Sequence, residues 1–194
     1  MILTDGDIVL RPLEMADAAD LYAAASESIP ELSRWLPWCH ENYSIEETRA
    51  FLASRSPVVL GGEQKADPTL RHHGFSGEWY SFGIRDRQTE RFLGGVGLNF
   101  VNRVHQSVNL GYWVRTSATG HGVASRATRL VAKFALEQLG VQRVEIIVAT
   151  GNLASQRVAE KAGAVREGVA RKRLLIWGEA MDAVVFSLVR EDLG

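Results

Sequence analysis

Apolar positions repeat at the spacing of an α-helix in four parts of the chain. These parts are residues 16–28, 44–54, 123–139 and 152–163. The third is the most regular, because its apolar residues fall on a single stripe and Gly140 follows as a natural stop. The second begins with Ser44, followed three residues later by Glu47, which is the arrangement of a capping box. Asn152 opens the fourth, where a short polar side chain can cap the first turn.

Other segments carry the alternating or continuous apolar pattern of β-strands. They are residues 7–13, 79–85, 92–101, 107–114, 143–150, 165–176 and 181–189. Turn residues at 86–90 and at Trp177-Gly178 predict two hairpins. We therefore expect a single α/β (α+β) domain over residues 1–194, with about seven strands in one mixed sheet and about four helices. Residues 57–77 are rich in Gly and Pro and lack periodicity, so we expect a long loop or lid there.

Composition narrows the classes of function. Apolar residues make up 46% of the chain and charged residues 23%, which allows a buried core and is unlike a disordered chain. The formal net charge of −1 offers no basic surface for nucleic acid. Cys39 is the only cysteine and the five histidines lack metal-ligand spacing, so we expect neither a disulfide nor a metal site. Without a secretory signal or an apolar run of ~20 residues, the protein is expected to be soluble and cytoplasmic, with no membrane partner.

The segment after residues 107–114 gives the clearest indication of chemistry. It enters the helix at Val123 through Thr119-Gly120-His121-Gly122. Glycines let a backbone approach a ligand closely, and the N–H groups and dipole of a helix N-terminus suit a phosphate or pyrophosphate. The alternative is that the two glycines only shape a turn. The segment is not a P-loop, because no Lys follows either glycine, and Ser125 stands where a Rossmann fingerprint needs its third glycine.

Longer stretches of the chain resemble a known family. The run that includes LGYWV, TGHGVASRATRL and VEIIVATGNLASQRVAEKAGAVREG is similar to the acetyl-CoA-binding core of the GNAT superfamily of N-acetyltransferases. The segments RPLEMADAADLY, RWLPW and LLIWGEAMDAVVFSLV extend the likeness, which is closest to ribosomal-protein N-terminal acetyltransferases of the RimJ/RimL type. The likeness leaves out only residues 57–77. It implies a GNAT-like domain with a mostly antiparallel sheet splayed at its centre, and acetyl-CoA (coenzyme A) as cofactor.

The resemblance assigns cofactor contacts to particular positions. Pantetheine would lie where the strands ending at Val114 and Val148 separate, and the main chain of Val114 and Arg115 would pair with it. The N–H groups that would hold the pyrophosphate are those of Gly120, His121, Gly122, Val123 and Ala124, with Ser125 nearby. Thr119 departs from the Gln or Arg that usually begins this loop, but the backbone donors remain.

Acetyl transfer to an amine needs a neutral nucleophile, a polarised thioester carbonyl and a proton for the leaving thiolate. The resemblance matches Asn152 and Ser155 to the family's N-x-x-S motif, which implies that they face the pantetheine and the sulfur of the cofactor. Ser155 is then the candidate acid. Local reasoning also allows Ser155 a purely structural role, because Ser in a first helical turn helps to satisfy unpaired N–H groups.

A general base is harder to find. Relatives often carry Glu at the position of Asn109, or on a later strand where Leu174 falls. Asn cannot take a proton, although its carbonyl can orient an amine or a water. Our hypothesis is therefore that no dedicated strong base exists, which favours α-amines with a pKa near ~8 over lysine amines near ~10.4. The reserve candidates for a base are Glu78, His40 and His105.

Aromatic residues give the only indication of the acceptor side. A substrate slot would be lined by Trp35, Trp38, Tyr43 and Trp79, although such residues also pack in ordinary cores. The 3′-phosphate of the cofactor could be met by Arg115, Arg126 and Arg157, which could equally be solvated charges. We expect acetylation of a peptide or protein α-amine by a monomer or homodimer. The alternatives are acetylation of a small amine, such as a polyamine or an aminoglycoside, and a non-catalytic acyl-CoA sensor.

Overall fold

The computed structural model describes residues 1–54 and 79–194, which fold around one sheet of eight strands. The strands are β1 (Leu3–Asp5), β2 (Ile8–Pro12), β3 (Tyr80–Asp86), β4 (Phe92–Asn102), β5 (Ser107–Val114), β6 (Arg143–Ala149), β7 (Val165–Ile176) and β8 (Glu179–Leu188). The helices are α1 (Ala18–Glu27), α2 (Ile29–Leu32), α3 (Ile45–Ser54), α4 (Val123–Gln138) and α5 (Leu153–Lys161). The predicted loop or lid at residues 57–77, and Glu78, lie outside the described residues.

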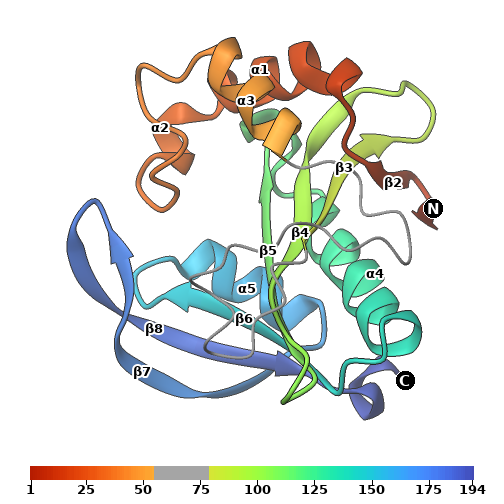
Figure 1. Cartoon of the computed structure of the whole chain (residues 1–194), viewed down its shortest axis with the longest axis vertical. Helices are drawn as coiled ribbons and strands as arrows, with labels where there is room; N and C mark the ends of the chain where they lie inside the picture. Colours follow the sequence, from red (N-terminus) through yellow and green to blue (C-terminus); the bar gives the residue numbers. More distant parts are fainter. Residues whose placement is uncertain (55–78) are drawn as a thin grey trace.

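The sheet is antiparallel except at one junction near its centre. Its order is β1-β2-β3-β4-β5-β6-β8-β7, and β5 with β6 is the parallel pair. A parallel pair needs a crossover connection, which here is α4. Figure 1 shows α4 running beside β4 and β5 before the chain returns through β6. The change from antiparallel to parallel pairing therefore falls where the helix carrying the glycine segment begins.

Helices cover both faces of this sheet (Figure 1). On one face α4 and α5 pack over the strands and build the larger core, in which Phe134 of α4 lies edge-on to Phe82 of β3 with ring centroids 6.0 Å apart. On the other face α1 and α3 build a smaller cluster, where Leu21 and Leu52 meet Phe92. The sheet is therefore the middle layer of three, and it separates two different environments.

Strand β5 contributes to both environments, because successive side chains on a strand point to opposite faces. Val108 and Leu110 are buried in the larger core beneath α4. Trp113 packs instead against the cluster that α1 and α3 form. The alternation therefore places Asn109 and Gly111 on the same face as Trp113.

The seven predicted strands and four predicted helices are all present, and the sheet has one further strand. The prediction missed β1 and α2, which are three and four residues long and too short to display a period. The capping box is confirmed, because Ser44 Oγ accepts from Glu47 N at 3.2 Å and Glu47 Oε2 accepts from Ser44 N at 2.9 Å. The N-cap is confirmed as well, because Asn152 Oδ1 accepts from Ser155 N at 3.1 Å.

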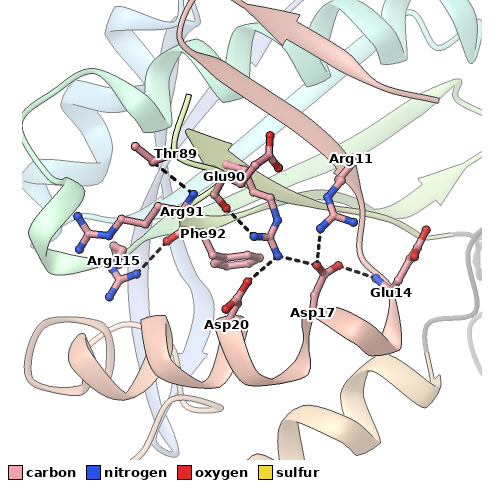
Figure 2. A network of polar contacts seen from close by, with 10 residues as sticks. Arg11, Glu14, Asp17, Asp20, Thr89, Glu90, Arg91, Phe92 and Arg115 are labelled. Carbon is pink, nitrogen blue, oxygen red and sulfur yellow. Dashed lines mark hydrogen bonds and ion pairs between the residues drawn. The ribbon is translucent and has the colours of Figure 1, made fainter. Parts of the chain in front are cut away.

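A buried ion network fastens the start of α1 to the sheet (Figure 2). Asp17 is only 2% exposed, and its Oδ1 accepts from Arg85 Nη2 at 2.7 Å and from Arg11 Nη2 at 2.9 Å. Arg85 also pairs with Asp20 at 2.9 Å and donates to Glu90 O at 2.7 Å. Burial works to lower the pKa of Arg85, but hydrogen bonds to Asp17 and Asp20 outweigh it and raise that pKa. The guanidinium is therefore charged, and both of its terminal nitrogens are hydrogen bonded or ion paired.

We predict that Asp17→Asn lowers the free energy of unfolding by about 1.5–3 kcal/mol, the usual value of a hydrogen bond to a charged group. The amide keeps the size of the carboxylate but leaves two guanidinium groups short of a negative partner, and Arg85 is buried. Asp20→Asn is the matched control, because Asp20 is 55% exposed and should cost less than about 1 kcal/mol. Urea denaturation measures both, and equal losses for the two variants would contradict the prediction.

Candidate active site

Strands β5 and β6 separate part of the way along their length. They pair only from Ser107 to Asn109 on β5 and from Arg143 to Glu145 on β6. Beyond this point β5 continues to Val114 while paired with β4, and β6 continues while paired with β8. The facing backbone edges of residues 110–114 and 146–149 are therefore available to an extended ligand lying between them. We call this opening the β5/β6 gap, and it has the splayed geometry that the family resemblance implies.

The glycine segment leads from the end of β5 into α4. Gly120 and Gly122 have φ of +83° and +74°, and Gly122 is the N-cap of α4 in the left-handed region. The first backbone hydrogen bond of the helix runs from Arg126 N to Gly122 O at 3.1 Å. The N–H groups of Val123, Ala124 and Ser125 precede that bond and are thus left for another acceptor. At the start of a helix of 16 residues, such donors fit an anionic diphosphate.

Side chains in this loop turn back onto the backbone. Thr119 Oγ1 donates to Thr116 O at 2.8 Å, and Ser125 Oγ donates to Gly122 O at 3.0 Å. The side chain of His121 is exposed to solvent. A ligand at this point would therefore meet mostly main-chain donors, which explains why Thr119 can stand where relatives carry a longer polar residue.

The C-terminal end of α1 anchors the segment that precedes the glycine loop. Arg115 pairs with Glu27 through Nε at 2.9 Å and through a second, very short contact. Glu27 also accepts from Ser117 N at 2.8 Å, and Ser28 Oγ accepts from Thr116 N at 3.0 Å. The hydrogen bonds from Arg115 and Ser117 lower the pKa of Glu27 to about 2. The Arg115 side chain is thus engaged within the protein, and the backbone N–H of Arg115 donates to Leu93 O on β4 at 2.9 Å.

The other two arginines suggested for the 3′-phosphate differ from Arg115. Arg126 lies in the first turn of α4 and forms an ion pair with Asp7 at 3.4 Å. Arg157 is exposed on α5. The side chains of Arg126 and Arg157 are therefore more accessible to a phosphate than that of Arg115.

Ser155 in the first turn of α5 meets a residue of β5 that the sequence did not single out. Tyr112 Oη donates to Ser155 O at 2.8 Å and lies 3.1 Å from Ser155 Oγ. The helix cap uses the backbone N–H of Ser155 and leaves its hydroxyl for Tyr112. Burial raises the pKa of Tyr112 to about 12, so its hydroxyl keeps its proton at neutral pH. Two hydroxyl groups therefore meet, one from β5 at one side of the gap and one from α5, the helix that follows β6.

Two amides lie where the gap begins. Asn109 Nδ2 donates to Asn99 Oδ1 at 2.8 Å, and the two residues are register partners on β5 and β4. On its other side Asn109 is the register partner of Glu145, a carboxylate that the sequence gave no reason to select. Glu145 accepts from Arg143 Nε at 2.9 Å. The amide at position 109 is therefore flanked by a second amide and by a carboxylate that already has a cationic partner.

The reserve bases lie elsewhere. His40 Nε2 lies 2.9 Å from Glu47 Oε1 in an exposed pair, and His105 is exposed in the turn after β4. Leu174, on β7, is the register partner of Met181 on β8.

An apolar cavity of about 450 Å³ lies between the sheet and the helices α1 and α3. Three of the four aromatic residues predicted for a substrate slot line it, namely Trp38, Tyr43 and Trp79. Trp113 of β5 also lines it and packs edge-on against Trp38, with ring centroids 5.6 Å apart. Trp35 does not, because its ring lies against Gly151 near the start of α5. Sequence reasoning missed Trp113 because its strand pattern alone does not tell which neighbours its face meets.

Within residues 1–54 and 79–194, no three His, Cys, Asp or Glu side chains are grouped as a metal site would require. In the same residues, no helix has the length and apolar character needed to cross a bilayer.

Known proteins match this chain over most of its length. Residues 7–165 match the family model described as Acetyltransferase (GNAT) domain. The Bacillus subtilis (strain 168) protein named "Probable N-acetyltransferase YjcK" is 30% identical over 186 residues, which is 95% of each chain. A Vibrio cholerae structure named as a "putative ribosomal-protein-serine acetyltransferase" is 27% identical, with a TM-score of 0.76 and 97% of each chain covered.

A third protein shares the fold. RimL, a ribosomal L7/L12 α-N-protein acetyltransferase solved in complex with coenzyme A, superimposes with a TM-score of 0.78 at 18% identity. The superposition covers 97% of this chain and 98% of that one. The chain therefore belongs to the GNAT family of acetyltransferases, resembles its ribosomal-protein (RimJ/RimL) members, and is an enzyme that uses acetyl-CoA as its acyl donor.

Proposed function

We propose that this enzyme acetylates the α-amino group of a peptide or protein. The observation that carries the proposal is the Ser155 hydroxyl, held by Tyr112 of β5 beside the β5/β6 gap. Acetyl-CoA, when bound, supplies the acetyl group as a thioester. Its diphosphate would be held by the main chain of residues 120–124, with Thr119 and Ser125 at the edges of that site. Its pantetheine would be held by the main chain of Val114, by the remaining lone pair of Arg115 O and by Asn152, since the Arg115 backbone N–H is already bonded to Leu93 O.

Ser155 is the proposed acid. It holds a proton at Oγ, and the Tyr112 hydroxyl 3.1 Å away fixes where that oxygen lies. Because the pKa of Tyr112 is raised to about 12, Tyr112 stays neutral and acts as a positioning residue rather than a base. Ser155 would give its proton to the departing thiolate as the new C–N bond forms and the C–S bond breaks. The proton that the amine nitrogen then loses would restore the Ser155 hydroxyl. General-acid assistance of this kind contributes about 10²- to 10⁴-fold to a rate.

The acceptor amine would be oriented by the paired amides Asn109 and Asn99. An amide can accept a hydrogen bond from an amine but cannot remove its proton. Such a site serves amines that are already neutral near pH 7, and α-amines meet this condition about 10²-fold more often than lysine side chains.

A polyamine would need a different cavity. Among the described residues that line the cavity, Glu47 carries the only charge, and it is hydrogen bonded to Ser44 and paired with His40. Glu41 and Glu46, which together with Glu47 would make an acidic patch, do not line it. A polycation therefore finds little negative charge there, which favours a peptide acceptor.

The acceptor class is tested by supplying acetyl-CoA with three kinds of amine and following release of the free thiol. The amines are lysine-free peptides with a free N-terminus, N-blocked peptides with one lysine, and small amines that include spermidine and an aminoglycoside. We expect free N-termini to react about 10²-fold faster than lysine side chains at pH 7. As the pH is raised, the rate should increase with the deprotonation of the acceptor amine and with no other titration.

Other outcomes would replace the proposal. Fastest reaction with spermidine or the aminoglycoside would make the protein a small-amine acetyltransferase. Thiol release with none of the amines, despite binding of acetyl-CoA, would favour a sensor. A rate that depends on a side-chain pKa of about 6–7 that is absent from the substrate would contradict the lack of a dedicated base.

A further inference from the structure

The cavity between the sheet and the helices α1 and α3 is built to hold an apolar group. Its walls include Trp38, Tyr43 and Trp113, whose rings pack edge-on with centroids 5.5–5.6 Å apart. Leu21 of α1 and Phe51 of α3 complete the helical side. A volume of about 450 Å³ falls in the range of small-molecule pockets, and desolvation would oppose a charged group in such surroundings.

Glycines form part of the cavity lining on the sheet side. Gly97 and Gly111 face each other as register partners on β4 and β5, and both line the cavity. A side chain at Gly97 is prevented by the backbone, because a Cβ there would lie 2.6 Å from Tyr80 O. At Gly111 a Cβ would meet nothing within 4 Å. Gly111 is therefore the position at which a side chain would enter the cavity without displacing the protein.

The cavity adjoins the proposed reaction centre. Gly111 and Tyr112 lie on β5 just beyond its last pair with β6, Asn109 with Glu145. Asn99, which accepts a hydrogen bond from Asn109, lines the cavity. Tyr112 also lines it, and the Tyr112 side chain extends from the opposite face of β5 to Ser155. A group attached to the carbon that carries the reacting amine could thus extend along β5 into the cavity.

We propose that this cavity receives the first side chain of the acceptor, and that the preferred acceptor begins with a large apolar residue such as Phe, Leu or Met. The inference rests on the proposed α-amine acetylation and adds the chemical class of the acceptor's first residue. Small or charged first residues, which would react equally well in an open site, are discriminated against here. The reason is that they leave the aromatic walls unfilled or place a charge among them.

The test compares lysine-free peptides that differ only at the first residue, which is Phe, Leu, Gly, Ser or Glu. For the unaltered enzyme we expect kcat/KM for Phe to exceed that for Gly by at least about tenfold, since one methylene in an apolar pocket is worth roughly 10- to 200-fold. The variant Gly111→Val should lower the Phe-to-Gly ratio by at least about tenfold. The control is Gly168→Val on β7, where a Cβ likewise meets nothing within 4 Å, and this variant should keep the original ratio.

The outcomes separate this inference from the function on which it rests. If no peptide is acetylated although coenzyme A binds, the proposed function fails. If peptides are acetylated but Gly, Ser or Glu is preferred, or if Gly111→Val leaves the ratio unchanged, the inference is overturned and the function stands. Faster reaction of the unaltered enzyme with octanoyl-CoA than with acetyl-CoA would assign the cavity to the acyl chain and would also overturn it. Thermal denaturation and calorimetry with coenzyme A verify that Gly111→Val is folded.

Discussion

The double variant Gly120→Ala/Gly122→Ala is expected to weaken coenzyme A binding by roughly 10²- to 10⁴-fold. Both glycines have positive φ, and a Cβ at Gly120 would meet no protein atom within 4 Å. We expect it to project into the space proposed for the diphosphate. Loss of two hydrogen bonds to a charged group costs about 3–6 kcal/mol, and each 1.4 kcal/mol is a factor of ten in affinity.

The measurement is isothermal titration calorimetry with coenzyme A, and the control is Gly140→Ala/Gly178→Ala. Those glycines have φ of +70° and +81° and also open surroundings, so alanine imposes a similar backbone cost of about 1–2 kcal/mol for each residue. Both double variants should therefore lose similar stability in thermal denaturation, while only the first loses coenzyme affinity. Equal affinities for the two would show that the diphosphate binds elsewhere.

Ser155→Ala is expected to lower kcat by about 10²- to 10⁴-fold, the usual contribution of a general acid. The KM for acetyl-CoA should change little, because the proposed diphosphate site lies on another helix. Stability should also be retained, since the cap of α5 is made by the Ser155 backbone N–H to Asn152 rather than by the hydroxyl. Steady-state assays with a fixed peptide acceptor measure both parameters.

Two further variants separate a chemical role for Ser155 from a structural one. Ser155→Thr keeps a hydroxyl and should recover most of the lost kcat. Tyr112→Phe removes the hydroxyl 3.1 Å from Ser155 Oγ and should lower kcat by a smaller factor, with the KM for acetyl-CoA unchanged. If Ser155→Ala kept full kcat, Ser155 would have no chemical role, and its only contribution would be the backbone contact that caps α5.

The elements proposed to bind the cofactor could be predicted largely from local sequence patterns. Helix α4 and the glycine segment before it are contiguous in the chain, so their apolar stripe and turn residues were sufficient to place both. The same holds for the N-cap Asn152 and the capping box at Ser44, because each cap is a contact over three residues. Local sequence patterns are sufficient for these features because the interactions that form them join residues close together in the chain.

The residues proposed to act on the acceptor amine could not be grouped from local sequence patterns. Tyr112 and Ser155 are 43 residues apart, and Asn109 meets Asn99 and Glu145 only through strand pairing. Trp35 was grouped with Trp38 because the two are close in sequence, yet only Trp38 lines the cavity. A period of two residues fixes which face a side chain occupies but not which strand or helix lies opposite.

By itself, the sequence determined the succession of strands and helices except β1 and α2, the glycine entry to α4 and, through its resemblance to a family, the acetyl-CoA chemistry. The tertiary structure decided where β5 and β6 part, which hydroxyl accompanies Ser155, and how large and how apolar the cavity beside them is. These features depend on pairing and packing between segments far apart in the chain. Their free energies come from contacts that no single segment contains.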